Sequence, residues 1–378
     1  MFALGAVRYL VEAGHTGNIR AVSSVSGGSV AAAMLADQWP KITASVSDDP
    51  VGAHVTDRLV ETISTKNLRN RGLGRFAGAR LRPGGRYGSA RGTTMVRHLL
   101  DAERMVDLPH DLQVVLTSTD LTTGRAFRMS QEFIGSWDLD YAPPPPTLGL
   151  ATALAASTAV PLIFPPIHLK TAGLGLKTRH GEMSLLDGGV YDNLGLEWFQ
   201  GRDRGRPAPA RECDFIICLD SSGSMPRRDK RFGWASSVRR SQAAQYQQSR
   251  TSRIRWYVDQ LLAGTMRGLH VPITYDPRTF TPPPGVERNP DAASGALPNG
   301  FAKNLSRIRT DLDRFSRTES DLLTYHGYWA THVRMHHLFP EMAVEAPSWM
   351  AFAALSTASI SILTETLERG ADFRVARR

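Results

Sequence analysis

A cluster of small residues between two apolar segments constrains the fold of this chain more than any other feature. Residues 24–29 read Ser-Val-Ser-Gly-Gly-Ser. The segment before them, 19–25, predicts a short buried strand, and residues 28–38 predict a helix that ends at Pro40. A strand, a tight turn and a helix in this order are typical of a parallel α/β unit.

A serine at such a junction would hold its hydroxyl at the start of the helix, where free backbone N–H groups favour negative charge. The stretch fits the spacing G-x-S-x-G, with Ser24 in place of the first glycine. We therefore predict Ser26 as a nucleophile, Gly27 N–H as an oxyanion donor and Gly28 as part of the turn. The alternative is an ordinary strand–helix turn in which Ser29 caps the helix.

A second motif, Asp-Gly-Gly-Val-Tyr-Asp-Asn-Leu-Gly, begins at Asp187 directly after an apolar segment. Gly188 and Gly189 would let the backbone turn sharply and display the carboxylate at the end of a strand, where open α/β sheets build their sites. A neutral hydroxyl needs a base, and Asp187 is the candidate for that role. The alternative is an Asp-Gly turn or a helix cap.

The two motifs together resemble the patatin-like phospholipase family of lipid acyl hydrolases. Residues 156–167 and the strand pair around 117–127 are similar to segments of the same family. The resemblance covers roughly residues 1–220. It implies a three-layer α/β/α fold with a central, mostly parallel sheet. It also implies a Ser–Asp dyad without histidine, in which Ser26 is the nucleophile and Asp187 is the base.

We therefore expect a catalytic domain over residues 1–225 and a helical C-terminal region over 226–378 that packs on the same domain or extends from it. Family members carry a strand and a Gly-rich oxyanion loop before the first helix, whereas this chain starts at Met1 inside that helix. We expect Met1 to be an internal methionine of a longer protein. The alternative is a catalytically impaired membrane-associated or interaction protein on the same fold.

The remaining pattern of apolar residues predicts further elements. They are helices over 2–13 and 148–158, with Thr147 as N-cap; strands over 111–130 and around 213–218; mainly helical regions over 232–270 and 300–370; and a Pro- and Gly-rich loop over 274–300. Asp192 and Asn193 are predicted to cap a helix after the second motif. Asp120 is predicted to be a turn residue.

Several histidines follow Asp187, so the chain order Ser, Asp, His of a triad is formally open. His332 and His336 lie four residues apart, but no glutamate completes a metalloprotease motif, and we interpret them as ordinary helix residues. The sequence therefore predicts neither a metal nor a cofactor. The histidines concerned are His270, His326, His332, His336 and His337.

The chain carries a formal net charge of +9; its basic residues are dispersed, and the densest runs are 69–91 and 227–240. A solvated basic face is the simplest interpretation, and contact with an anionic membrane is the next. No nucleic-acid-binding signature accompanies either run. Trp234, Trp256, Tyr257, Trp329 and Trp349 could seat helices at a lipid interface, although core packing is their commoner use.

Two cysteines, Cys213 and Cys218, lie five positions apart on one predicted strand and therefore face opposite sides, which argues against a disulfide between them. Their use suits a reducing compartment.

No signal peptide is recognised, and the apolar C-terminal stretch 349–368 is interrupted by Ser and Thr, which favours a packed helix over a membrane span. We expect a cytoplasmic protein, with peripheral attachment to membranes left open and the oligomeric state unknown.

Overall fold

The computed structural model describes most of the chain, and the basic run 69–91 and the apolar segment 349–368 lie outside the described residues. The described residues are 1–65, 93, 96–161, 163–178, 180–200, 213–223, 225, 231–308 and 315–344.

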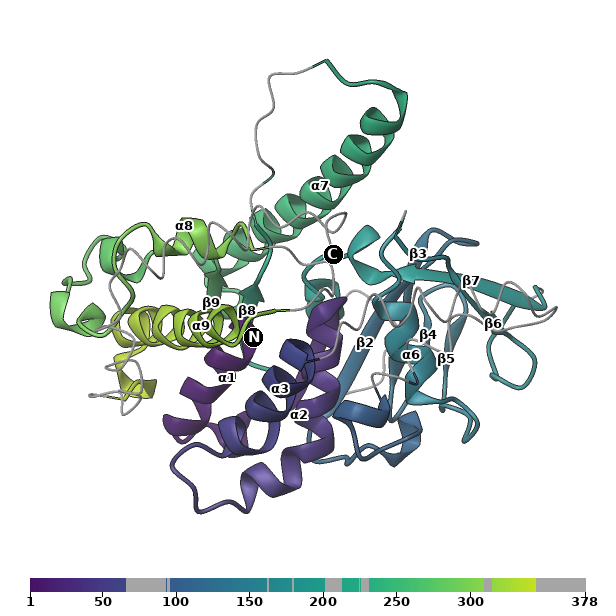
Figure 1. The fold of residues 1–378 in the computed structure, drawn as a ribbon, viewed down its shortest axis with the longest axis horizontal. Helices are drawn as coiled ribbons and strands as arrows, with labels where there is room; N and C mark the ends of the chain where they lie inside the picture. The colour runs from purple at the N-terminus through teal and green to yellow at the C-terminus, as the bar shows by residue number, and fades with distance from the viewer. Residues whose placement is uncertain are drawn as a thin grey trace.

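A seven-stranded sheet forms the centre of the N-terminal half of the protein (Figure 1). Its strand order is β5-β4-β3-β2-β7-β6, and β1 pairs with β2. Among the strands that the structure describes, β1 and β2 are the only parallel pair in this sheet. The prediction of a mostly parallel sheet is therefore wrong. The strands are β1 (Ala21–Val25), β2 (Gln113–Asp120), β3 (Arg125–Ser130), β4 (Ile134–Ser136), β5 (Asp140–Ala142), β6 (Ile167–Lys170) and β7 (Glu182–Asp187).

The lengths of the connections explain why most pairs are antiparallel. A four-residue turn, 121–124, joins β2 to β3, and so short a connection allows only antiparallel neighbours. The side chain of Asp120 accepts hydrogen bonds from the Thr122 N–H and the Thr123 hydroxyl, so its predicted turn role is confirmed. The β1–β2 connection instead contains helices α2 (Gly27–Thr43) and α3 (Asp57–Thr65), which allow a parallel crossover.

Helix α2 begins where the sequence predicts but continues past Pro40 to Thr43. A proline in the last turn removes only one backbone donor, and the carbonyl of Pro40 still accepts from the Ala44 N–H at 3.2 Å. Helix α6 (Leu150–Ser157) also forms as predicted, but its N-cap is Gly149 rather than Thr147. Both helices pack apolar side chains against the main sheet in one core.

A second, two-stranded parallel sheet follows in the chain, made of β8 (Phe215–Asp220) and β9 (Arg267–Pro272). The long helix α7 (Trp234–Leu262) connects the two strands. Strand β9 lies in a region for which we predicted helix, because its apolar stretch is short and follows the helical pattern of α7 after only four residues. None of the helices within the described ranges is long and apolar enough to cross a bilayer.

Helices from the two ends of the described chain pack against each other. α1 (Phe2–Glu12) lies against α9 (Arg317–Leu338), and α8 (Phe301–Leu305) packs nearby (Figure 1). The backbones approach closely because glycines stand at the contact: a Cβ at Gly5 would overlap the Thr324 carbonyl, and one at Gly327 would overlap that of Phe2. These helices and β9 share a second apolar core.

Two histidines of α9 are buried in this second core. His326 Nε2 lies 2.8 Å from the Ile273 carbonyl oxygen, and the His332 ring packs edge-on against Tyr9 and Trp329. Burial lowers the pKa of each to about 4, and nearby His336 contributes to the shift at His332. Both rings are therefore neutral at pH 7 in the folded protein.

We expect the free energy of unfolding to decrease as the pH falls from about 6.5 to 4. The unfolded chain binds protons at ordinary histidine pKa values near 6.5, before His326 and His332 can do so in the folded protein. Each histidine accounts for at most about 3 kcal/mol of this loss. Chemical denaturation across this range should show a weaker pH dependence in His332→Phe. The exposed control His110→Gln should keep the wild-type slope, and equal slopes in all three proteins would contradict the assignment.

Candidate active site

Ser26 occupies a strained turn between β1 and α2. Its φ and ψ are 54° and −130°, and Ser26 and Asp140 are the only non-glycine residues with positive φ among those the structure describes. This conformation is unfavourable for a residue with a Cβ, so the surrounding structure must hold it in place. Strain of this kind is typical of a nucleophile that must be displayed at a strand–helix turn.

Hydrogen bonds of buried hydroxyl groups hold the turn against β2 and α6. The Ser24 hydroxyl donates to the Val115 carbonyl at 3.1 Å, which explains why serine is tolerated where the motif usually has glycine. The hydroxyls of Ser29 and Ser157 lie 2.7 Å apart, and that of Ser157 also donates to the Thr117 carbonyl at 2.7 Å. The side chain of Ser29 is thus buried in this network and does not cap α2.

The pairing register of β2 brings the two predicted motifs together. On one edge of β2, Val25 of β1 pairs with Thr117, and Asp187 of β7 pairs with the next residue, Ser118. The parallel β1 and the antiparallel β7 therefore approach from opposite directions, and their C-terminal ends meet on the same edge. Ser26 follows directly after Val25, so it leaves the sheet at the point where Asp187 ends β7.

Contacts at the second motif hold Asp187 at this meeting point. The Asp187 side chain is only 1% exposed, and its Oδ1 accepts the Gly189 N–H at 2.8 Å. Its own N–H donates to the Ala159 carbonyl at 3.0 Å. A Cβ at Gly188 would overlap the backbone carbonyl of Thr117 and stand 3.2 Å from Val25 Cγ1, so only glycine fits there without a backbone shift.

The opposite side of the turn is open. Gly27 and Gly28 are exposed, and a Cβ added to either would have no neighbour within 4 Å. The first N–H groups of a helix have no partner within the helix, so those of Gly27 and Gly28 are available to an oxygen placed above Ser26. The arrangement thus combines a half-buried hydroxyl, a buried carboxylate and helix N–H donors with open approach.

Sequence reasoning missed Tyr246, which reaches this site from α7. A Cβ at Gly189 would stand 2.6 Å from Tyr246 Cε1, so the ring lies directly over the second motif. Burial and the nearby charge of Asp187 raise the pKa of Tyr246. Its hydroxyl is buried and has no hydrogen-bond partner among the described residues. No motif marks this tyrosine, and only the packing of α7 against the loop reveals it.

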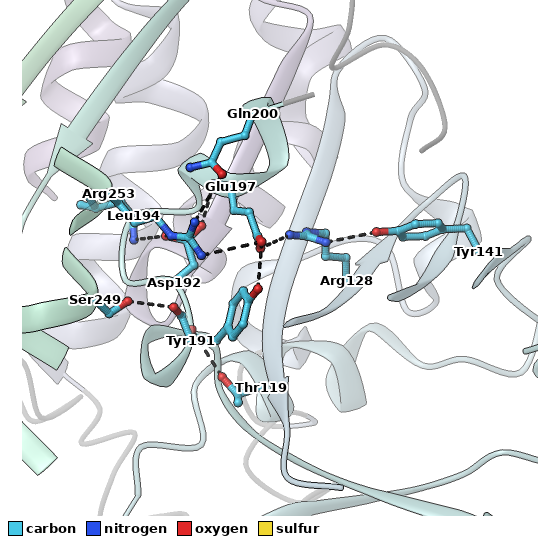
Figure 2. Close-up of polar contacts among 11 residues, drawn as sticks. Thr119, Arg128, Tyr141, Tyr191, Asp192, Leu194, Glu197, Gln200, Ser249 and Arg253 are labelled. Atoms are coloured by element: carbon cyan, nitrogen blue, oxygen red, sulfur yellow. Dashed lines mark hydrogen bonds and ion pairs between the residues drawn. The ribbon is translucent and has the colours of Figure 1, made fainter. Parts of the chain in front are cut away.

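A polar network joins the loop after Asp187 to both the sheet and α7 (Figure 2). Glu197 forms an ion pair with the buried Arg128 at 2.6 Å and accepts the Tyr191 hydroxyl at 2.8 Å. Arg253 of α7 lies 3.7 Å from Glu197, and Ser249 donates to the Tyr191 carbonyl at 2.8 Å. Figure 2 shows Glu197 between the two arginines, so its charge is compensated from both sides.

The remaining polar residues of the second motif have structural roles. Asp192 accepts the N–H groups of Leu194 and Glu197 and so caps the 3-10 turn Leu196–Gln200, where we predicted the start of a longer helix. Asn193 instead donates to the Ser222 hydroxyl at 2.9 Å, which ties the loop to the end of β8.

The candidate histidines make their contacts elsewhere. His270 Nε2 lies 3.5 Å from Asp220 Oδ2, and His336 and His337 contact Asn289. Within the described part of the chain, none of these contacts of the five histidines involves Ser26 or Asp187. Across the described residues, no group of three His, Cys, Asp or Glu side chains could hold a metal ion.

Comparison with known families agrees with this geometry. A family model described as patatin-like phospholipase matches residues 1–198, more than half of the chain. The chain belongs to the patatin-like phospholipase family. The matched region includes the Ser26 turn and the Asp187 motif and ends before α7, so Tyr246 lies outside it. No curated protein sequence matches the chain.

Proposed function

We propose that this patatin-like protein is a serine acyl hydrolase that cleaves lipid esters through Ser26 and Asp187. The observation that carries the proposal is the pairing of Val25 and Asp187 with adjacent residues of β2. In that register, β1 and β7 end side by side on β2, with a strained serine after one strand and a buried carboxylate at the end of the other. The family's lipid hydrolase activity supports the substrate class. We assign the chemistry to residues 1–225 and treat the region 226–378 as its support.

In this proposal the Ser26 Oγ attacks the ester carbonyl carbon while its proton passes to the Asp187 carboxylate. The carbonyl oxygen becomes an oxyanion, and the N–H groups of Gly27 and Gly28 stabilise it. The tetrahedral intermediate collapses, the alcohol leaves with the proton held by Asp187, and the acyl group stays on Ser26. Water, deprotonated by Asp187, then releases the fatty acid and restores the serine.

The environment of Asp187 suits a base that acts without histidine. Its Oδ1 is held by the Gly189 N–H, which fixes the carboxylate plane. Gly188 and Gly189 are fixed in turn by the Thr117 backbone and the Tyr246 ring. No disulfide joins Cys213 and Cys218, which suits action in a reducing compartment such as the cytoplasm.

A covalent label tests the proposal. A fluorophosphonate probe should attach to the intact protein, and mass spectrometry of its peptides should place the adduct on Ser26. Ser26→Ala should lose the label, whereas the exposed-serine control Ser47→Ala should keep it. A folded wild-type protein that neither reacts with the probe nor hydrolyses esters would support the alternative, a non-catalytic protein on the same fold.

A further inference from the structure

The N-terminal end of α7 exposes large apolar side chains. Trp234 is 84% exposed, and Phe232 and Val238 are 41% and 42% exposed. Figure 1 shows this end of the helix projecting from the rest of the molecule. Core packing, the commoner role of such aromatics, thus does not apply to Trp234. We call the residues Arg231, Phe232, Trp234, Val238 and Arg240 the α7 tip.

The α7 tip combines these apolar groups with positive charge. Arg231 is exposed, and the guanidinium of Arg240 lies 5.9 Å from the centre of the Phe232 ring. The segment 231–240 contains three arginines and no acidic residue. Trp234 and Val238 are four residues apart and therefore share one face of the helix. Aromatic and aliphatic side chains beside arginines are typical of elements that lie in the headgroup region of a bilayer.

We propose that the α7 tip docks the protein on an anionic lipid surface. Trp234, Phe232 and Val238 would enter the boundary between headgroups and acyl chains, and the arginines would bind lipid phosphates. Residues 231–240 contain three arginines and no acidic residue, which favours this occupant over a second copy of the chain, because a symmetric contact would place arginines against arginines. The docking does not depend on catalysis, but its role in delivering substrate rests on the proposed function.

The other half of α7 fixes the tip relative to the candidate active site. Twelve residues separate Trp234 from Tyr246, or about 18 Å along the helix. Beyond that point Ser249 and Arg253 hold the loop after Asp187, and Arg250 forms a buried ion pair with Asp220. One rigid helix thus connects the proposed lipid contact to the loop that positions the carboxylate.

Co-sedimentation of the full chain with vesicles tests this proposal. The Ser26→Ala protein is used, so that no turnover alters the lipids and the result is independent of ester hydrolysis. We expect binding to vesicles of phosphatidylcholine with about one-third phosphatidylserine, and weaker binding to pure phosphatidylcholine or at high salt. Adding Phe232→Ala with Trp234→Ala, or Arg231→Glu with Arg240→Glu, should weaken anionic binding about tenfold or more.

Matched controls lie on the same helix. Leu262 is 82% exposed at the opposite end of α7, and Arg255 is exposed in its C-terminal half. Leu262→Ala and Arg255→Glu should bind vesicles as the parent does, and all variants should keep its thermal melting temperature. Unchanged binding in both tip variants would overturn the proposal. So would equal binding to neutral and anionic vesicles, or a dimer in light scattering that the tip variants dissociate.

Discussion

Replacing Ser26 with Ala is expected to lower kcat/KM for a p-nitrophenyl ester by at least about 10³, because the variant has no oxygen to form the acyl bond. Asp187→Asn is expected to cost about 10²–10⁴, since an amide cannot accept the serine proton. Its remaining oxygen can still accept the Gly189 N–H, so the loop should keep its shape. Steady-state kinetics on the purified proteins measure both effects.

The double variant gives the sharper result. If Ser26 and Asp187 act on the same proton, Ser26→Ala with Asp187→Asn should be no less active than Ser26→Ala alone. Asp192→Asn is the matched control, because Asp192 is an equally buried carboxylate in the same loop that caps a turn and pairs with Arg253. Losses that multiply in the double variant would mean that the two residues act independently, and the proposed dyad would be wrong.

Replacing Arg250 with Met is expected to lower the free energy of unfolding by about 3–5 kcal/mol. Arg250 Nε and Nη2 lie 2.7 and 2.6 Å from Asp220 Oδ2, and the Asp220 side chain is fully buried. Burial opposes the ionisation of Asp220, but the contacts with His270 and Arg250 outweigh it and hold its pKa below the usual value. Without the arginine, the carboxylate would lose its ion pair in a buried environment.

Urea denaturation measures this effect. The exposed Arg255→Met, on the same helix, should change stability by less than about 0.5 kcal/mol. Removing both charges in Arg250→Met with Asp220→Leu should restore much of the loss, because no unpaired charge then remains buried. If Arg250→Met is as stable as the wild type, other groups compensate the charge of Asp220, and the ion pair with Arg250 does not stabilise the packing of α7.

The sequence predicted the local elements of the site but not the sheet around them. Ser26 and Asp187 are proposed from the sequence because tight strand-end turns demand small residues, and that demand is visible in the sequence. The pairing of β2 with β7 joins segments that lie far apart in the sequence, so no local pattern reveals it, and the six residues of β9 are too few to show a clear periodicity. Tyr246 was missed for a similar reason, since its role depends on the packing of α7 rather than on spacing.

Because β1 and β7 both pair with β2, the register of β2 sets the separation of the two residues proposed to react, Ser26 and Asp187. The length of the loops between positions 26 and 187 does not change this register, so these loops are free to vary or to gain insertions. One residue added between Thr117 and Ser118 would instead push the two strand ends apart and turn the following side chains to the other face.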